Sequence, residues 1–159
     1  MLRLSKKSDY ALIAMKHLAT RADGGGSASA REISESYDIP LELLAKVLQR
    51  LVRARLLASV QGTRGGYRLG RNAALISVAD VIQAVDGPVT VTACSTDDHN
   101  CDQYTKCSIR DPLWKIKNRI VDALSTVSVA EMAADVDAPA PVSTHTVSRM
   151  MFVPPIGEN

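Results

Sequence analysis

The chain has 159 residues, 46% of them hydrophobic, which is enough to bury one modest core and predicts one domain with an appendage. Residues 1–30 show no pattern of a secretion signal, and no stretch is long and apolar enough to cross a membrane. We therefore expect a cytoplasmic protein, in which an odd number of cysteines argues against a disulfide framework.

Charge is divided unevenly along the chain. Residues 1–71 hold 13 Lys and Arg against 6 Asp and Glu, a net charge of +7, whereas residues 72–159 hold 6 against 11, a net charge of −5. A basic segment suits a polyanion, because each neutralised phosphate releases condensed counterions. The first half is therefore a candidate DNA-binding region, although a merely solvated basic face would give the same charge.

Two helices are predicted before residue 38. The first covers residues 5–21, where apolar residues recur at helical spacing. The second begins after Ser29, whose side chain is expected to cap it, with Glu32 at the capping-box position. Ile33 and Tyr37 are then expected to face inward.

A third helix begins at or near Pro40 and runs to about Arg55. Two helices joined by so short a connection predict a helix-turn-helix, with this third helix as the recognition helix. An ordinary helical hairpin is the alternative. The apolar residues of the third helix form a stripe wide enough to bury: Leu43, Leu44, Val47, Leu48, Leu51 and Val52.

A short β-hairpin is predicted directly after the third helix. Residues 56–60 and 67–69 are predicted strands around the glycine-rich turn of residues 61–66. A hairpin in this place is typical of a wing, whose tip lies along the minor groove, and Arg64 is the cationic residue at that tip. The wing favours a winged helix-turn-helix over a plain hairpin of helices.

The second half is predicted to hold one shorter and one long helix. Ser77 caps a helix that runs to about Val85 and stops at Gly87. The long helix begins at Asp111, a cap followed by Pro112 at the first helical position. Apolar residues spaced by four, three, four, four and three positions form a seam along it: Ile109, Leu113, Ile116, Ile120, Leu124 and Val127.

The seam is expected to pair two subunits, because the first domain already has enough apolar faces to close on itself. A short final helix contains Glu131, and the residues after it are expected to form a flexible tail. The predicted fold is mainly α with a small β-hairpin, a winged helix-turn-helix with a long dimerisation helix. Its parts are a DNA-binding domain at 1–86, a cysteine loop at 87–108, the dimerisation and final helices at 109–134 and a tail at 135–159.

Three cysteines, Cys94, Cys101 and Cys107, lie within fourteen residues. The polar residues between them have no apolar periodicity, so their order is expected to come from something other than a core. Thiolates bind soft metals, but this spacing matches neither the close pairs of structural zinc nor the tight runs of ferredoxins. The loop therefore predicts a ligand cluster without naming the metal. Possible fourth ligands within it are His99, Asp98 and Asp102.

Two other functions remain to be weighed. A zinc-bound or metal-free regulator would use the same cysteines as a thiol redox switch on the same fold. An enzyme is not expected, because no two cysteines lie two residues apart and no Ser-His-Asp or Cys-His order is evident.

Five features of the chain occur together: LSKKSDYAL at 4–12, IPLELLAKVL at 39–48, GGYRL at 65–69, GPVTVTAC at 87–94, and the three-cysteine loop followed by Trp114. This combination resembles the bacterial iron-sulfur regulator family of IscR and NsrR, most closely its branch of SUF-system iron-sulfur assembly regulators. The resemblance covers about residues 1–135. It is specific because it joins the wing to the cysteine loop.

The resemblance implies a homodimeric DNA-binding transcription regulator with an iron-sulfur cluster of the two-iron or four-iron type. Such a protein senses iron, oxygen or nitric oxide through its cluster and controls genes of cluster assembly. In NsrR-like members an aspartate near the start of the first helix supplies a ligand from the other subunit, and Asp9 matches it. IscR-like members use a histidine where this chain has Arg110. The implied metal ligands are Cys94, Cys101, Cys107 and Asp9.

The resemblance also bears on DNA recognition. IscR-like members read bases with a glutamate in the recognition helix and an arginine at the wing base, where this chain has Ala45 and Gln61. We therefore expect a different operator. The residues expected at the DNA interface are Ser29, Glu42, Lys46, Arg50, Gln61, Thr63 and Arg64.

Overall fold

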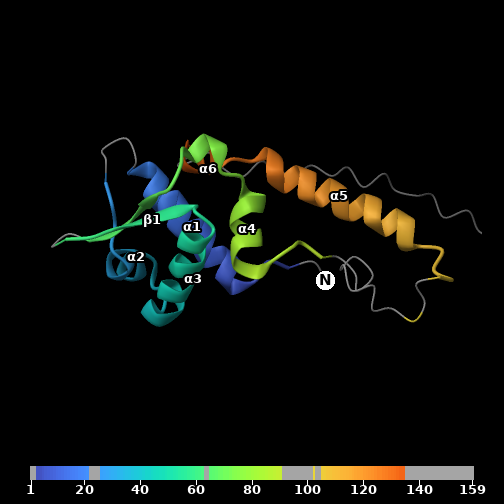
Figure 1. The fold of residues 1–159 in the computed structure, drawn as a ribbon, viewed down its shortest axis with the longest axis horizontal. Helices are drawn as coiled ribbons and strands as arrows, with labels where there is room; N and C mark the ends of the chain where they lie inside the picture. Colours follow the sequence, from blue (N-terminus) through green and yellow to red (C-terminus); the bar gives the residue numbers. More distant parts are fainter. Residues whose placement is uncertain (1–2, 22–25, 63–64, 91–101, 103–104, 135–159) are drawn as a thin grey trace, which may run out of the picture.

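The computed structural model describes residues 3–21, 26–62, 65–90, 102 and 105–134. Figure 1 shows most of the helices gathered beside a two-stranded hairpin, while one long helix extends away from them. The predicted fold class, mainly α with a small β-hairpin, is confirmed. The elements in chain order are α1 (Lys6–Thr20), α2 (Ala30–Tyr37), α3 (Leu41–Arg53), β1 (Leu57–Val60), β2 (Gly66–Leu69), the 3-10 turn η2 (Ala73–Leu75), α4 (Val78–Asp86), α5 (Arg110–Thr126) and α6 (Val129–Ala134).

Helices α2 and α3 form the predicted helix-turn-helix. The hydroxyl of Ser29 accepts a hydrogen bond from the backbone N–H of Glu32 at 3.1 Å, which caps α2 as expected. The Glu32 carboxylate forms an ion pair with Arg21 next to the end of α1, so α2 is fastened to α1. The buried side of α3 consists of Leu44, Val47, Leu48 and Leu51, four members of the predicted stripe.

The wing is a hairpin with a third chain segment along its second strand. Strands β1 and β2 are antiparallel, with Leu57 opposite Leu69 and Val60 opposite Gly66. Ala28 exchanges two backbone hydrogen bonds with Tyr67, at 3.0 and 2.8 Å, so the residues before α2 pair with β2. A Cβ at Gly66 would lie 2.5 Å from the Ala28 carbonyl oxygen, so this approach requires glycine.

Helix α4 is capped as predicted, and α6 returns to the first domain. Ser77 and Asp80 form a reciprocal capping box. The N–H of Val78 donates to the carbonyl of Val127, and the N–H of Val129 donates to the carbonyl of Ile76, at 2.9 and 2.8 Å. The Val129 side chain is fully buried in the main core. The segment that follows α5 is therefore part of the same core as α1 to α4.

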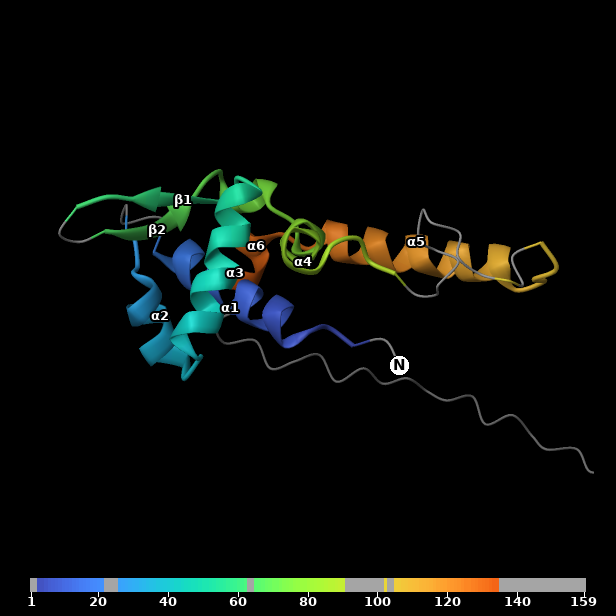
Figure 2. The same ribbon diagram turned by 60° about the horizontal axis from the view of Figure 1, so that its bottom comes forward.

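Helix α5 projects from this domain, and Figure 2 shows it extending on the side opposite the wing. It begins at Arg110 with Ile109 as its N-cap, so the prediction that Asp111 caps it is wrong. Asp111 lies in the first turn and pairs with Arg110 at 2.7 Å, where its charge favours the helix dipole. The helix buries none of its residues fully, and Ile116 of the seam is 47% exposed. Of the predicted seam residues, Ile109, Ile116 and Val127 are exposed, whereas Leu113, Ile120 and Leu124 are half-buried.

Tyr37 differs from its prediction, because 44% of it is exposed and it does not enter the core. Its ring lies edge-on to the imidazole of His17, with centroids 5.5 Å apart, and its hydroxyl is 3.1 Å from His17 Nδ1. His17 itself is buried, and its Nε2 has no hydrogen-bond partner among the described atoms. Tyr37 was misassigned because helical spacing cannot reveal a polar partner on another helix.

None of the helices in the described ranges is sufficiently long and apolar to span a membrane.

The buried His17 predicts that acid destabilises the junction of α1 and α2. Burial lowers the pKa of His17 from its ordinary value of 6.5, the charge of Arg21 lowers it further, and Glu32 opposes the shift. Neutral imidazole is therefore favoured in the folded state. The stability that buried neutral His17 contributes is fully present above pH 6.5 and is lost as the pH falls below that value.

We expect the free energy of unfolding, from urea titrations, to fall more between about pH 7.5 and about pH 5.5 in the native chain than in His17→Gln. An equal fall in both proteins would contradict this assignment.

Candidate nucleic-acid interface and cysteine segment

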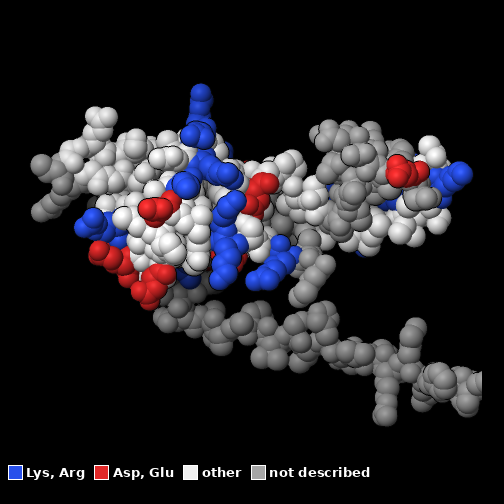
Figure 3. All heavy atoms as spheres, turned by 90° about the horizontal axis from the view of Figure 1, so that it is seen from below, with Lys and Arg blue, Asp and Glu red and all other residues white. Residues whose placement is uncertain are grey.

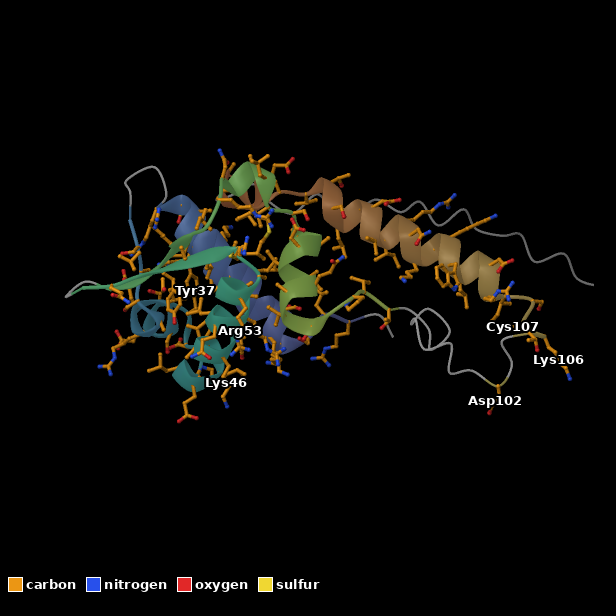
Figure 4. The ribbon with its side chains drawn as sticks, in the orientation of Figure 1. Tyr37, Lys46, Arg53, Asp102, Lys106 and Cys107 are labelled. Carbon is orange, nitrogen blue, oxygen red and sulfur yellow. The ribbon has the colours of Figure 1, made fainter. Side chains whose placement is uncertain are left out.

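The exposed polar face of α3 is the candidate DNA-reading surface. Glu42, Lys46, Gln49 and Arg53 are all exposed and follow one another at intervals of four, three and four residues, which places them on one side of the helix. Figure 4 shows Lys46 and Arg53 along α3, and Figure 3 shows a band of Lys and Arg side chains across the face seen from below. The face offers cations for phosphates together with groups able to bond to base edges.

Gln49 and Arg53 were not among the predicted site residues. They line a hollow of about 270 Å³ between α3 and the wing, together with Val52, Ser59 and Tyr67. The periodic spacing that joins them to Lys46 was available in the sequence. Their place beside the wing was not, because it depends on how the hairpin folds back on α3.

The other predicted DNA-binding residues are placed as follows. Arg50 is exposed but directs Nη1 to the carbonyl oxygen of Val85 at the end of α4. Ser29 is half-buried at the start of α2, and Gln61 is exposed just after β1. Thr63 and Arg64, at the wing tip, lie outside the described residues.

The first turn of α1 carries Asp9, the predicted fourth metal ligand, on its exposed side. Ser5 caps this turn, because its hydroxyl accepts from the Ser8 N–H at 3.2 Å. The side-chain hydroxyls of Ser5 and Ser8 both donate to Asp86 Oδ2 at the end of α4, and the Ser8 bond is 2.6 Å long. The start of α1 is therefore bonded to the end of α4.

Asp86 is held as a carboxylate. Burial alone would raise the pKa of Asp86, but the hydrogen bonds from Ser5 and Ser8 and the charges of Lys7 and Arg50 outweigh burial and lower it below its ordinary range. A cavity of about 360 Å³ opens beside Asp86, between the chain before α1 and the apolar side chains Ile82, Ile120 and Leu124.

Cys107 lies just before α5, half-buried, and Figure 4 shows it with Asp102 and Lys106 beyond the outer end of that helix. At 1.5 Å per residue, the 17 residues of α5 separate this end from the domain by about 25 Å. Cys94, Cys101 and His99 lie outside the described residues. Within the described part, no group of three His, Cys, Asp or Glu side chains meets. The segment supplies three thiols, donors that suit a soft metal or an iron-sulfur cluster, and Lys106 directly precedes the third of them.

Comparison with known proteins agrees with this geometry. A family model described as Rrf2, iron-dependent transcriptional regulator, matches residues 4–135. The HTH-type transcriptional regulator IscR of Vibrio vulnificus strain YJ016 is 36% identical over 135 residues, which are 84% of this chain and 79% of that protein. These matches confirm the predicted resemblance and a transcription regulator in place of an enzyme.

Two solved structures have the same fold. The structure of T. potens IscR matches with a TM-score of 0.67 at 28% identity, covering 86% of this chain and 89% of that one. The oxidised form of Staphylococcus aureus CymR matches with a TM-score of 0.68 at 26% identity, covering 86% of this chain and 100% of that one.

Removing the cation of Lys46 is expected to weaken DNA binding by the loss of one phosphate contact. In Lys46→Ala, the slope of log affinity against log salt concentration should fall by about 1, measured by fluorescence anisotropy on a duplex that the protein selects from a random library.

Lys115→Ala removes the same charge from the exposed side of α5 and should leave the slope unchanged. Equal slopes in Lys46→Ala and the native chain would remove Lys46 from the interface.

Proposed function

The chain belongs to the Rrf2 family of transcriptional regulators, and we propose that it binds its operator as a homodimer whose affinity is set by an iron-sulfur cluster. The observation that carries this proposal is the position of Cys107. It lies at the outer end of a projecting helix with an uncovered apolar seam, where a second subunit would meet it. We propose that the protein acts in the cytoplasm and that it controls genes of iron-sulfur cluster assembly.

The proposed DNA contacts follow from the face of α3 and from the wing. The recognition helix enters the major groove, while the wing tip lies along the minor groove. To the predicted set the geometry adds Gln49 and Arg53, which line the hollow beside the wing. The full proposed set is Ser29, Glu42, Lys46, Gln49, Arg50, Arg53, Gln61, Thr63 and Arg64.

The proposed dimer is formed by the seam of α5. Ile109, Ile116 and Val127 are 60%, 47% and 42% exposed, a row of large apolar side chains along one helix. Pairing two such helices removes these residues from water and brings each outer end toward the other subunit's domain.

The proposed ligands are Cys94, Cys101 and Cys107 of one subunit with Asp9 of the partner subunit. A shared site is supported by the separation of Cys107 from α1 within one chain. Asp9 is exposed and projects from the first turn of α1, so a partner can reach it. When bound, the cluster supplies a link that iron shortage, oxygen or nitric oxide can remove.

A zinc-bound or metal-free thiol switch is the second candidate. The likeness to S. aureus CymR favours it, because that protein has been solved in an oxidised form. In this alternative the three thiols change oxidation state directly, and no iron is needed.

Cysteine replacement distinguishes the two candidates. Protein purified without oxygen should contain iron and sulfide and absorb visible light, and Cys107→Ser should lose most of both, because serine is a poor soft-metal ligand. Ser108→Ala, which alters the exposed neighbour, should retain them. Zinc in place of iron, or no metal at all, would reject the cluster and favour the thiol switch.

A charge placed on the seam should separate the subunits. Ile116→Asp is expected to raise the dimer dissociation constant at least about tenfold, because pairing would bury a carboxylate without a partner. Light scattering across a concentration series measures this. Asn118→Asp adds the same charge to an exposed position off the seam and should remain dimeric. An Ile116→Asp protein as dimeric as the native chain would place the interface elsewhere.

A further inference from the structure

A line of polar contacts runs from the first turn of α1 to the recognition helix. Its first step joins α1 to α4, because the hydroxyls of Ser5 and Ser8 donate to the same oxygen, Asp86 Oδ2. Ser8 is fully buried, so its hydroxyl has no water to replace this bond. The orientation of the first turn of α1 is therefore tied to the last residue of α4.

The second step joins α4 to α3. The guanidinium of Arg50 donates to the carbonyl oxygen of Val85, the residue directly before Asp86. Val85 is buried and cannot move independently of the core. Two adjacent residues at the end of α4 are thus bonded to α3 and α1, Val85 through its backbone carbonyl and Asp86 through its carboxylate.

The two ends of this contact line lie beside residues that the proposed switch uses. Asp9, the proposed cluster ligand, directly follows Ser8 in the first turn of α1. Arg50 belongs to the same helix as Lys46 and Arg53, which face the proposed DNA surface. Immediately after Asp86 the chain turns at Gly87, with φ at 86°, and leads into the cysteine segment. The end of α4 is therefore bonded to both α1 and α3 and leads along the chain toward the cysteine segment, whose Cys107 lies at the far end of α5.

We propose that Asp86 and Arg50 are positioning residues that couple the state of Asp9 to the orientation of the recognition helix. A pull on Asp9 rotates the first turn of α1, and Ser5 and Ser8 carry that displacement to Asp86. The adjoining Val85 carbonyl carries it to Arg50 and so to α3. This inference rests on the proposed function, and it assigns Arg50 a role inside the protein in addition to any contact with DNA.

The coupling is measured as the ratio of two dissociation constants for the selected duplex, one for the cluster-free protein and one for protein loaded with iron and sulfide. We expect the native ratio to depart from one by about fivefold or more, in either direction. In Asp86→Ala and in Arg50→Gln the ratio should return to within about twofold of one. Ratios equal to the native value in both variants would overturn the inference.

Two controls show what the ratio reports. Lys46→Ala should raise both dissociation constants by the same factor and keep the native ratio, because it removes a contact with DNA but does not interrupt the contact line. Gln83→Ala, at an exposed position of α4 whose side chain makes no hydrogen bond among the described residues, should change neither constant. A variant that had merely lost its fold would lose DNA binding in both states, with a lower melting temperature.

A second measurement works without the cluster and separates the two proposals. Because coupling is reciprocal, DNA bound at α3 should slow amide hydrogen exchange at Ser8 and Asp9 of the cluster-free protein by about threefold or more. These amides are bonded to Ser5, at 3.2 and 3.0 Å. Asp86→Ala should abolish the slowing, and Gln83→Ala should retain it.

A native affinity ratio of one with this pattern of exchange would reject the cluster switch and keep the contact line. Slowing that persists in Asp86→Ala would reject the contact line alone.

Discussion

The arrangement of the molecule depends on where the projecting segment is fastened at its two ends. The chain leaves the DNA-binding domain after α4 and returns through Val127 and Val129, whose backbone groups bond to Val78 and Ile76 on either side of Ser77. The residues that follow α5 are thus held against the start of α4 at the core. Helix α5 extends outward from this point, which places Cys107 at its far end.

A contact at the other end of α4 engages one of the cations of α3. The polar residues of α3 separate into a face with Lys46 and Arg53, and a position, Arg50, whose guanidinium is bonded to the end of α4. Both kinds of residue add positive charge to the first half of the chain. The Arg50 guanidinium already donates to a protein partner, so it has fewer N–H groups left for phosphates than an unbonded arginine would have. Net charge alone therefore overstates the surface available to DNA.

Local signals in the sequence predicted much of the fold. Ser29 and Ser77 cap the helices as expected, and the stripe of α3 and the seam of α5 follow from residue spacing alone. What spacing could not predict depends on contacts between residues far apart in the chain. Tyr37 was expected in the core and lies against His17 instead, and Asp111 was expected as a cap although Ile109 takes that place. The bonds from Ser5 and Ser8 to Asp86 join residues 81 and 78 positions apart, and no periodicity reports them.

Polar contacts at the junction of α1, α4 and α3 suit the proposed switch because their free energies have the right magnitude. A hydrogen bond to a charged group contributes about 1.5–3 kcal/mol, and the coupling between two sites in a regulated protein is typically about 1–3 kcal/mol. Releasing one or two bonds at Asp86 therefore changes the free energy by as much as a response requires. By comparison, truncating a buried leucine such as Leu48 to alanine costs about 2–5 kcal/mol, a large part of the stability of a domain. The buried side of α3 is part of that core, so the proposed coupling requires displacements of α3 that are small enough to keep its leucines packed.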